Sequence, residues 1–317
     1  MGVLPCERTW YTKNAENSAG IHEEKPMKSA PKALVLGGHT GLLGQALMDA
    51  LSRSAWQAVP FGRQDGQILD VDFLARKIKR IAPEVIFNTI AWTQVDEAEL
   101  HPSEAMALNR GFVSSLAHVI KGASIRLVQY STDFVFDGAK QTPYTIEDAP
   151  NPESVYGATK LAGEQALGVL PPEQYCIVRT AWLFGPGRKN FVSTILAACR
   201  KKDSINVVHD QTGSPTYTRD LAQWSLKLAE LEAGGIFHAV NGGQATWCDL
   251  ACEAVSLAEA TCRVEPISSA QWPQKAKRPP FSVLDTGRLT RVTGLVPRPW
   301  PLALREYLYS EYLPLHS

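Results

Sequence analysis

The chain lacks a long apolar run, an excess of either charge, and any Cys-x-x-Cys pair. Without about 18 consecutive apolar residues, the sequence predicts no membrane-spanning helix. Its 32 basic and 32 acidic residues give a formal net charge of zero. A dedicated nucleic-acid binder needs a basic excess to neutralise phosphates. We therefore expect neither membrane nor nucleic acid as a partner.

Cysteine is sparse and poorly placed for metal binding. Cys248 and Cys252 are one helical turn apart, but no histidine cluster accompanies them, so zinc is the lesser alternative and we expect no bound metal. A set of reduced thiols favours a cytoplasmic location. The six cysteines are Cys6, Cys176, Cys199, Cys248, Cys252 and Cys262.

Residues 1–31 are polar and contain neither a core segment nor the hydrophobic region of a signal peptide. We expect a disordered extension there, and Met27 is an alternative start. The remaining sequence is long enough for one large domain or two closely joined ones. With 44% hydrophobic residues overall, it can bury a sizeable core.

Apolar runs of strand length alternate with segments of helical period. Strands are expected at 32–38, 56–63, 84–91 and 125–131, and continuous Val/Ile/Leu runs are typical of sheets covered on both faces. This alternation predicts an α/β fold with a Rossmann-like, doubly wound parallel sheet. We expect an NADP-binding domain over 32–185. Residues 186–317 should form mostly a smaller substrate-binding lobe, with some segments returning to the first domain.

A glycine-rich turn, "GGHTGLLG", follows the first expected strand and opens a helix. We assign Gly38 to the tight turn, Gly41 to the approach of backbone amides to a diphosphate, and Gly44 to close helix–strand packing. Amides at a helix start favour such an anion. The alternative is an ordinary glycine-rich turn, which this strand–turn–helix context disfavours.

The end of the second strand bears on the choice of cofactor. Arg63 suits a ribose 2′-phosphate and therefore favours NADPH, whereas Asp65 lies two residues on and leaves NADH open. The alternative is that Arg63 is a solvated surface residue. Asp70 or Asp72 is expected to cap the next helix, and Asp70 could instead bind the adenine amino group.

The stretch "ESVYGATK" places Tyr156 and Lys160 four residues apart. On a helix opened by Pro152 and Glu153, the phenol and the ammonium lie on one face. We expect Lys160, together with an oxidised nicotinamide, to lower the pKa of the phenol. Ser131 and Thr132 end the preceding strand and can hold a substrate carbonyl while Tyr156 donates a proton. Chance occurrence of Tyr-x-x-x-Lys on a surface helix is the alternative.

Taken together, these blocks resemble the dTDP-4-dehydrorhamnose reductase family of the extended short-chain dehydrogenase/reductase superfamily. The resemblance runs from Ala33 to the C-terminus. It is carried in order by "GGHTGLLG", "NTIAWTQVDEAE", "STDFVFDG", "YGATKLAGEQA", "VRTAWLFGPGRKNFV", "DQTGSPTYTRDLA", "GIFHAVNGGQATWCDLA" and "RPPFSVLDTGRL". It implies NADPH-dependent reduction of the 4-keto group of dTDP-4-dehydro-L-rhamnose to dTDP-L-rhamnose.

The resemblance also implies roles for single residues. The triad is Thr132, Tyr156 and Lys160, with Ser131 beside it on the substrate. Trp182 matches an aromatic residue that the family places against the sugar, with core packing as its alternative. Ala91 and Thr93 match positions that flank the cofactor, and Asn109 matches a helix asparagine of the family. Further expected cofactor-binding residues are Thr40, Leu42, Leu43, Asp70 and Val71, and further substrate positions are Asn190, Gln211 and Arg278.

Some positions depart from the family pattern. Thr89 and Ile90 replace small residues and are expected to tighten the cofactor wall, and Phe134 replaces a common tyrosine. Ala46 stands where members that dimerise through magnesium carry glutamate, so we expect no shared metal site. The expected state is a monomer or a homodimer. Two alternative functions remain: reduction of another nucleotide 4-ketosugar, or a non-catalytic NADP-binding regulatory subunit of the methionine adenosyltransferase type.

Overall fold

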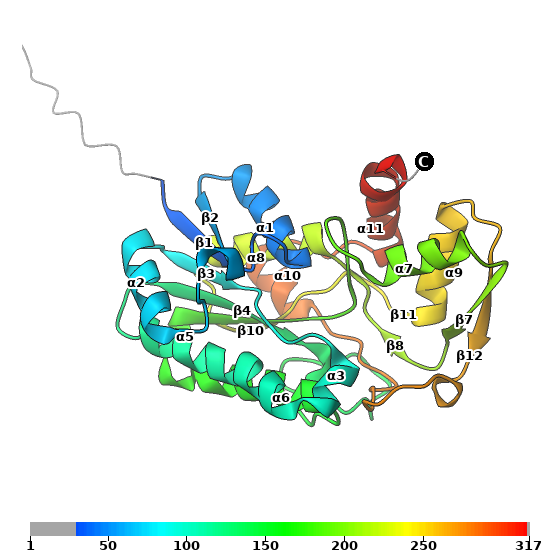
Figure 1. Ribbon diagram of the computed structural model, residues 1–317, viewed down its shortest axis with the longest axis horizontal. Coiled ribbons are helices and arrows are strands. Elements are labelled where there is room, and N and C mark those ends of the chain that lie inside the picture. Colours follow the sequence, from blue (N-terminus) through cyan, green and yellow to red (C-terminus); the bar gives the residue numbers. More distant parts are fainter. Residues whose placement is uncertain (1–29, 316–317) are drawn as a thin grey trace, which may run out of the picture.

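A six-stranded parallel sheet forms the centre of the computed structural model, which describes residues 30–315 (Figure 1). The doubly wound α/β prediction is confirmed. The strand order reverses between β1 and β3, and ligands of such folds bind at this switch point, beyond the carboxyl ends of the strands. In spatial order the strands are β10 (Gly235–His238), β5 (Tyr175–Thr180), β4 (Arg126–Thr132), β3 (Val85–Asn88), β1 (Lys32–Leu36) and β2 (Gln57–Phe61).

Helices cover both faces of this sheet (Figure 1). Alternate strand residues point to opposite faces, so Val35 and Phe87 pack on one side while Leu34 and Ile86 pack on the other. Burial of both faces explains the unbroken apolar runs of these strands. The first face carries α1 (Leu42–Ser52), α8 (Thr218–Glu230) and α10 (Gly287–Thr293), and the second carries α2 (Val71–Ile81), α5 (Val113–Ile120) and α6 (Val155–Ala166).

A second group of elements has its own apolar core, in which Phe184, Tyr217 and Tyr307 are buried. The elements α8, β10 and α10 leave this group and return to the sheet. The division at residues 185 and 186 stays a prediction. The group contains α7 (Phe191–Cys199), α9 (Trp247–Leu257), α11 (Trp300–Tyr307) and the strand pairs β7 (Ser204–Val208) with β12 (Arg263–Ile267), β8 (Thr212–Gly213) with β11 (Ala245–Thr246), and β6 (Leu183–Phe184) with β9 (Thr216–Tyr217).

The helical region that follows β3 is interrupted. After α3 (Val95–Leu100), α4 (Pro102–Met106) runs into a π-helical segment, Ala107–Phe112, before α5 begins. Such segments recur at functional sites, and this one carries the buried side chain of Asn109. The periodicity of the sequence gave no sign of the π segment, because it adds one residue to a turn without changing composition.

Two further sequence expectations concern the described range. Within residues 30–315, no helix is both long and apolar enough to cross a membrane. The cysteines of the same range are free thiols. Residues 1–29 of the predicted disordered extension lie outside the residues that the structure describes.

A buried ion pair fastens α6 to the sheet. Arg179 of β5 donates from Nε to Glu164 Oε1 (2.9 Å) and from Nη2 to Oε2 (2.7 Å). The two side chains are 2% and 5% exposed. Removing one partner of such a pair leaves the other charge buried and uncompensated, which costs far more than losing an exposed pair.

We therefore expect Glu164→Ala to lower the free energy of unfolding by about 3–5 kcal/mol. Glu97→Ala is the matched control, because Glu97 pairs with His101 at 3.9 Å while 48% exposed. The control should cost less than about 1 kcal/mol. Urea unfolding followed by circular dichroism measures both. Equal losses for the two variants would contradict the importance of the buried pair.

Candidate active site

The turn after β1 has the conformation that only glycine adopts readily. Gly37 has φ +87°, and a Cβ there would lie 2.4 Å from Thr89 Oγ1. The role of turn residue, which we predicted for Gly38, therefore belongs to Gly37. Gly38 does not have positive φ, and its missing Cβ instead leaves room for Pro60 of β2. The Thr89 hydroxyl also donates to Leu36 O (2.7 Å), so Thr89 braces the turn.

The start of α1 has the features of a diphosphate cradle. A Cβ on Gly44 would lie 2.3 Å from Gly37 O, so α1 can approach the turn this closely only with glycine there. Gly41 occupies the N-cap position and no side chain caps this end of the helix, within the described part of the chain. The first-turn amides are therefore available to an anion. Thr40, Leu42 and Leu43 lie in the same turn, and their cofactor contacts stay predictions.

Arg63 and Asp65, the two residues expected near the cofactor's ribose, differ in their contacts after β2. Asp65 accepts from the Gly62 amide (2.8 Å) and lies 2.7 Å from His39 Nε2. Arg63 is exposed and forms no ion pair among the residues that the structure describes. Because the acid is engaged and the cation is not, this arrangement favours a 2′-phosphate over a free 2′-hydroxyl.

Asp70 is the N-cap of α2, since its Oδ1 accepts from the Phe73 amide (3.0 Å). Between the two capping candidates, the structure thus selects Asp70 over Asp72. The neighbouring Val71 is 43% exposed, which leaves an apolar surface beside the turn. An adenine contact of Asp70 or Val71 stays a prediction.

Asn109 links the loop after β3 to α6. Its Oδ1 accepts from the Trp92 amide (2.8 Å), and its Nδ2 donates to Thr159 Oγ1 (2.9 Å). Ala91 and Thr93 flank Trp92, partly buried and exposed respectively, at the switch-point edge of the sheet. The side chain of Asn109 therefore fixes both a wall of the predicted cofactor site and the helix that carries Tyr156.

The helix α6 begins later than expected. Pro152 and Glu153 precede it, and Ser154 is the N-cap, accepting from the Gly157 amide (3.2 Å). The prediction that Pro152 and Glu153 open the helix is wrong, because serine is the better cap. Glu153 pairs with Lys277 instead.

A second carboxylate completes this helix start. Glu99 Oε1 accepts from the Val155 amide (2.8 Å), at the positive end of the helix. Sequence reasoning missed Glu99, although it lies in the quoted block "VDEAE". Its acidic type was the available signal, but 56 residues separate the two partners.

Tyr156 is held against the end of β4. A Cβ on Gly157 would lie 2.1 Å from Phe134 O, so glycine allows α6 to contact the turn after β4. The rings of Phe134 and Tyr156 meet edge to face, with centroids 5.8 Å apart. Lys160 is 5% exposed and donates from Nζ to Tyr130 O (2.6 Å). The structure thus brings Thr132, Tyr156 and Lys160 together around the end of one strand.

Burial dominates the ionisation of this group. Desolvation raises the pKa of Tyr156 to about 12, while the Thr132 hydroxyl lowers it and Asp133 raises it further. Desolvation also lowers the pKa of Lys160 to about 8. The net shift of the phenol pKa is opposite to the lowering that we expected from Lys160 together with an oxidised nicotinamide. Desolvation outweighs the other effects, and the Lys160 ammonium donates to the Tyr130 carbonyl. Tyr156 therefore keeps its proton at neutral pH, as a proton donor must.

Trp182 lies in a strained position in the second lobe. Its φ is +47°, which is unusual for a bulky residue, and its ring stacks on Trp247 at 3.5 Å with an interplanar angle of 5°. Strain of this kind clusters at ligand sites. Sequence reasoning missed Trp247, which lies 65 positions away in the block "QATWCDLA". The contact of Trp182 with a sugar stays a prediction.

The remaining substrate candidates make mostly internal contacts. Asn190 caps α7, accepting from the Ser193 amide (3.2 Å) and donating to Gly185 O (2.8 Å). Arg278 pairs with Asp96 (2.9 Å), whose pKa is lowered although burial alone would raise it. Gln211 is buried between β7 and β8. These three residues shape the second lobe, and their direct contact with substrate stays a prediction.

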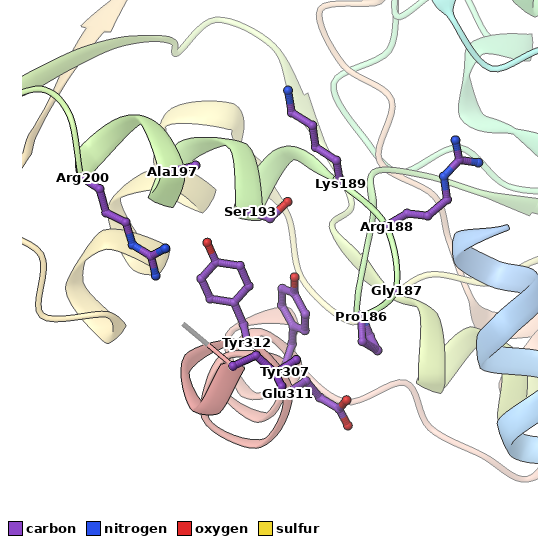
Figure 2. A pocket seen from close by; sticks show the side chains of 11 residues that line it. Pro186, Gly187, Arg188, Lys189, Ser193, Ala197, Arg200, Tyr307, Glu311 and Tyr312 are labelled. Carbon is purple, nitrogen blue, oxygen red and sulfur yellow. The ribbon is translucent and has the colours of Figure 1, made fainter. Parts of the chain in front are cut away.

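A cavity of about 390 Å³ lies between the C-terminal helix and α7 with the loop that precedes it. The Tyr307 and Tyr312 rings stand there, whereas Arg188 and Lys189 extend away from them (Figure 2). Its lining includes none of Thr132, Tyr156 and Lys160. It is therefore distinct from the catalytic candidates.

Comparison with known proteins relates this chain to one protein family. Residues 32–312 match the family model described as the RmlD substrate binding domain. The dTDP-4-dehydrorhamnose reductase of Streptomyces griseus is 41% identical over 284 residues, covering 87% of this chain and 92% of that protein. The dTDP-4-keto-6-deoxy-D-glucose reductase of Streptomyces niveus is 39% identical, covering 85% and 94%. The dTDP-4-dehydrorhamnose reductase of Bacillus anthracis, solved with NADP, aligns with TM-score 0.84 and 30% identity, covering 88% and 99%.

Arg63→Ala should weaken NADPH binding by about tenfold, the loss of one exposed charge-assisted contact to phosphate, and leave NADH binding nearly unchanged. Fluorescence titration with each cofactor measures this. Arg80→Ala is the control, since Arg80 is an exposed arginine in the last turn of α2, away from the strand ends. Equal losses for the two cofactors would contradict a role of Arg63 at the 2′-phosphate.

Proposed function

The chain belongs to the RmlD substrate binding domain family, whose members include dTDP-4-dehydrorhamnose reductases, and from that premise we propose that it reduces the 4-keto group of dTDP-4-dehydro-L-rhamnose with NADPH. The product is dTDP-L-rhamnose. The observation that carries the proposal is the position of Tyr156 beside the Thr132 hydroxyl, with Lys160 of the same helix bound to Tyr130 O in β4. A carbonyl bound there meets a proton donor and a hydroxyl at once.

The residues present fit the dinucleotide. Gly41 and Gly44 let the start of α1 lie against Gly37 in the turn, and the uncapped start of α1 offers amides to the diphosphate. Arg63 provides the cation for a 2′-phosphate. When bound, NADPH supplies the hydride that the carbonyl carbon accepts.

The side chains of this chain manage the proton. As the carbonyl carbon gains a hydride, its oxygen takes up negative charge and accepts the proton of the Tyr156 hydroxyl. The Thr132 hydroxyl holds that oxygen in place. The Lys160 ammonium, charged below its pKa of about 8, favours the phenolate left on Tyr156. The reduction thus consumes one hydride and one proton and leaves a secondary alcohol.

The names of the relatives support two 4-keto sugars as substrate. A relative named for dTDP-4-keto-6-deoxy-D-glucose is nearly as similar as one named for dTDP-4-dehydrorhamnose. Both names share the dTDP group and a 4-keto sugar. The stacked Trp182 and Trp247 give the second lobe a rigid aromatic surface, which suits an apolar sugar face.

A cytoplasmic location is part of the same inference. It is supported by the free thiols of Cys176, Cys199, Cys248, Cys252 and Cys262, because disulfide-forming compartments favour oxidised pairs. We expect the enzyme to be a monomer or a homodimer.

The substrate is tested by NADPH oxidation against dTDP-4-dehydro-L-rhamnose, dTDP-4-keto-6-deoxy-D-glucose and a UDP-linked 4-ketosugar. We expect the highest kcat/KM with dTDP-4-dehydro-L-rhamnose and the lowest with the UDP sugar. Higher kcat/KM with dTDP-4-keto-6-deoxy-D-glucose would reassign the substrate. No oxidation with any of them would overturn the reductase function.

Tyr156→Phe should lower kcat by at least about 100-fold, because it removes the general acid and keeps the ring. NADPH affinity, measured by fluorescence, should stay close to wild type. Tyr309→Phe is the control, since Tyr309 is 47% exposed and outside the site. A Tyr156→Phe enzyme with near wild-type turnover would show that another group donates the proton.

A further inference from the structure

Asp133 is a buried carboxyl next to the proposed carbonyl-binding hydroxyl, and the reaction as described does not use it. It is 2% exposed. Thr132 Oγ1 donates to its Oδ1 (3.0 Å), and Ser282 Oγ donates to its Oδ2 (2.5 Å). Each carboxylate oxygen thus has one hydroxyl partner.

Ser282 comes from a distant part of the chain. It lies 149 positions after Asp133, between Phe281 and Val283, which pack in one apolar cluster with Val135 and Phe136. Its amide donates to Thr212 O (2.8 Å) at the start of β8. Ser282 is therefore fixed by the second lobe, and it holds Asp133 from that side.

Thr132 has one hydroxyl proton, and its direction matters for a carbonyl. One lone pair of Oγ1 accepts from the Phe134 amide (3.2 Å). A charged Asp133 can only accept hydrogen bonds, so the Thr132 hydroxyl donates to it. The Thr132 oxygen then presents a lone pair to any bound carbonyl oxygen. A protonated Asp133 can donate to Oγ1 instead. The Thr132 proton is then free to donate to the carbonyl.

We propose that Asp133 is a positioning residue whose neutral carboxyl, held between Thr132 and Ser282, donates a hydrogen bond to Thr132 Oγ1 and so turns the Thr132 hydroxyl toward the substrate carbonyl. The neutral carboxyl is the productive form. Asp133 acts through Thr132 and transfers no proton to the substrate. This inference rests on the proposed ketosugar reduction, because it concerns the same carbonyl.

The pKa of the Asp133 carboxyl lies in a pH range in which the enzyme can be assayed. Burial raises the pKa of Asp133 to about 6, while the hydrogen bonds from Ser282 and Thr132 lower it. The productive form is populated below that pKa and lost as the pH rises through it. Titratable or charged side chains on the surrounding elements are Tyr156, Lys160 and Glu164 on α6, Arg179 on β5, and Arg278 and Asp285 on the segment that carries Ser282.

Two substitutions at Asp133 separate charge from shape. In Asp133→Asn, the amide oxygen can accept from Ser282 while the amide nitrogen donates to Thr132, as the neutral carboxyl does. Asp133→Ala leaves the Thr132 proton undirected. We expect kcat of the Asn variant to exceed that of the Ala variant by roughly tenfold or more, the scale of one misdirected donor at a developing oxyanion.

The pH dependence gives a readout that a merely structural role would not move. Wild-type kcat should fall as the pH rises through about 6. Asp133→Asn should lack this limb between pH values of about 5.5 and 7.5, which end below the pKa of about 8 of Lys160. Ser282→Ala removes a hydrogen bond that lowers the pKa of Asp133, so its limb should move to higher pH.

Measurements that do not depend on turnover complete the experiment. The pH-difference infrared spectrum should show a protonated carboxyl in wild type that Asp133→Asn removes. NADP⁺ affinity and melting temperature check the fold. Asp137→Asn is the matched control, because Asp137 follows in the same loop and accepts from Tyr144 and Asn151 rather than from Thr132. This control should keep the wild-type pH limb.

The outcomes are distinguishable. If wild type does not reduce a nucleotide 4-ketosugar, the proposed function fails first. If wild type is active and Asp133→Asn is as impaired as Asp133→Ala with unchanged melting temperature, the negative charge is needed and the proposal is overturned. An unchanged pH limb in both Asp133→Asn and Ser282→Ala would also overturn it.

Discussion

The site depends on one close contact, between the start of α6 and the turn that follows β4. Gly157 lies where a Cβ would come within 2.1 Å of Phe134 O, so the helix touches the strand end without an intervening side chain. Lys160 then reaches Tyr130 O in the same strand. Because a strand and a helix are the two rigid parts, the hydroxyls of Thr132 and Tyr156 keep a fixed relation.

Several polar contacts hold that helix in place, and each comes from a different element. Ser154 and Glu99 satisfy amides at its start, Asn109 binds Thr159 in its middle, and Arg179 pairs with Glu164 near its end. Most are buried or partly buried, where an unpaired group is costly. The family motif "YGATKLAGEQ" therefore specifies the attachment of the helix as well as its chemistry.

The same burial sets the ionisation of the site. Desolvation keeps Tyr156 protonated and lowers the pKa of Lys160. It also brings Asp133 close to the range in which its charge can change. A site that reduces a ketone needs a protonated acid and hydrogen-bond donors that face the substrate. Burial away from water keeps the acid protonated without any specific partner. The direction of the donors depends on particular neighbours, and Ser282 is one of them.

Features that depend on local periodicity could be predicted from the residues alone. Alternating apolar runs and helical segments gave the parallel sheet, the glycines marked the turn after β1, and the spacing of Tyr156 and Lys160 placed both on one helix face. The block order then gave the family. Partners far apart in the chain became known only from the folded structure: Asp133 with Ser282, Trp182 with Trp247, and Val155 with Glu99. Periodicity reports the face of an element, whereas such partners depend on how whole elements pack, and that information is spread over the entire chain.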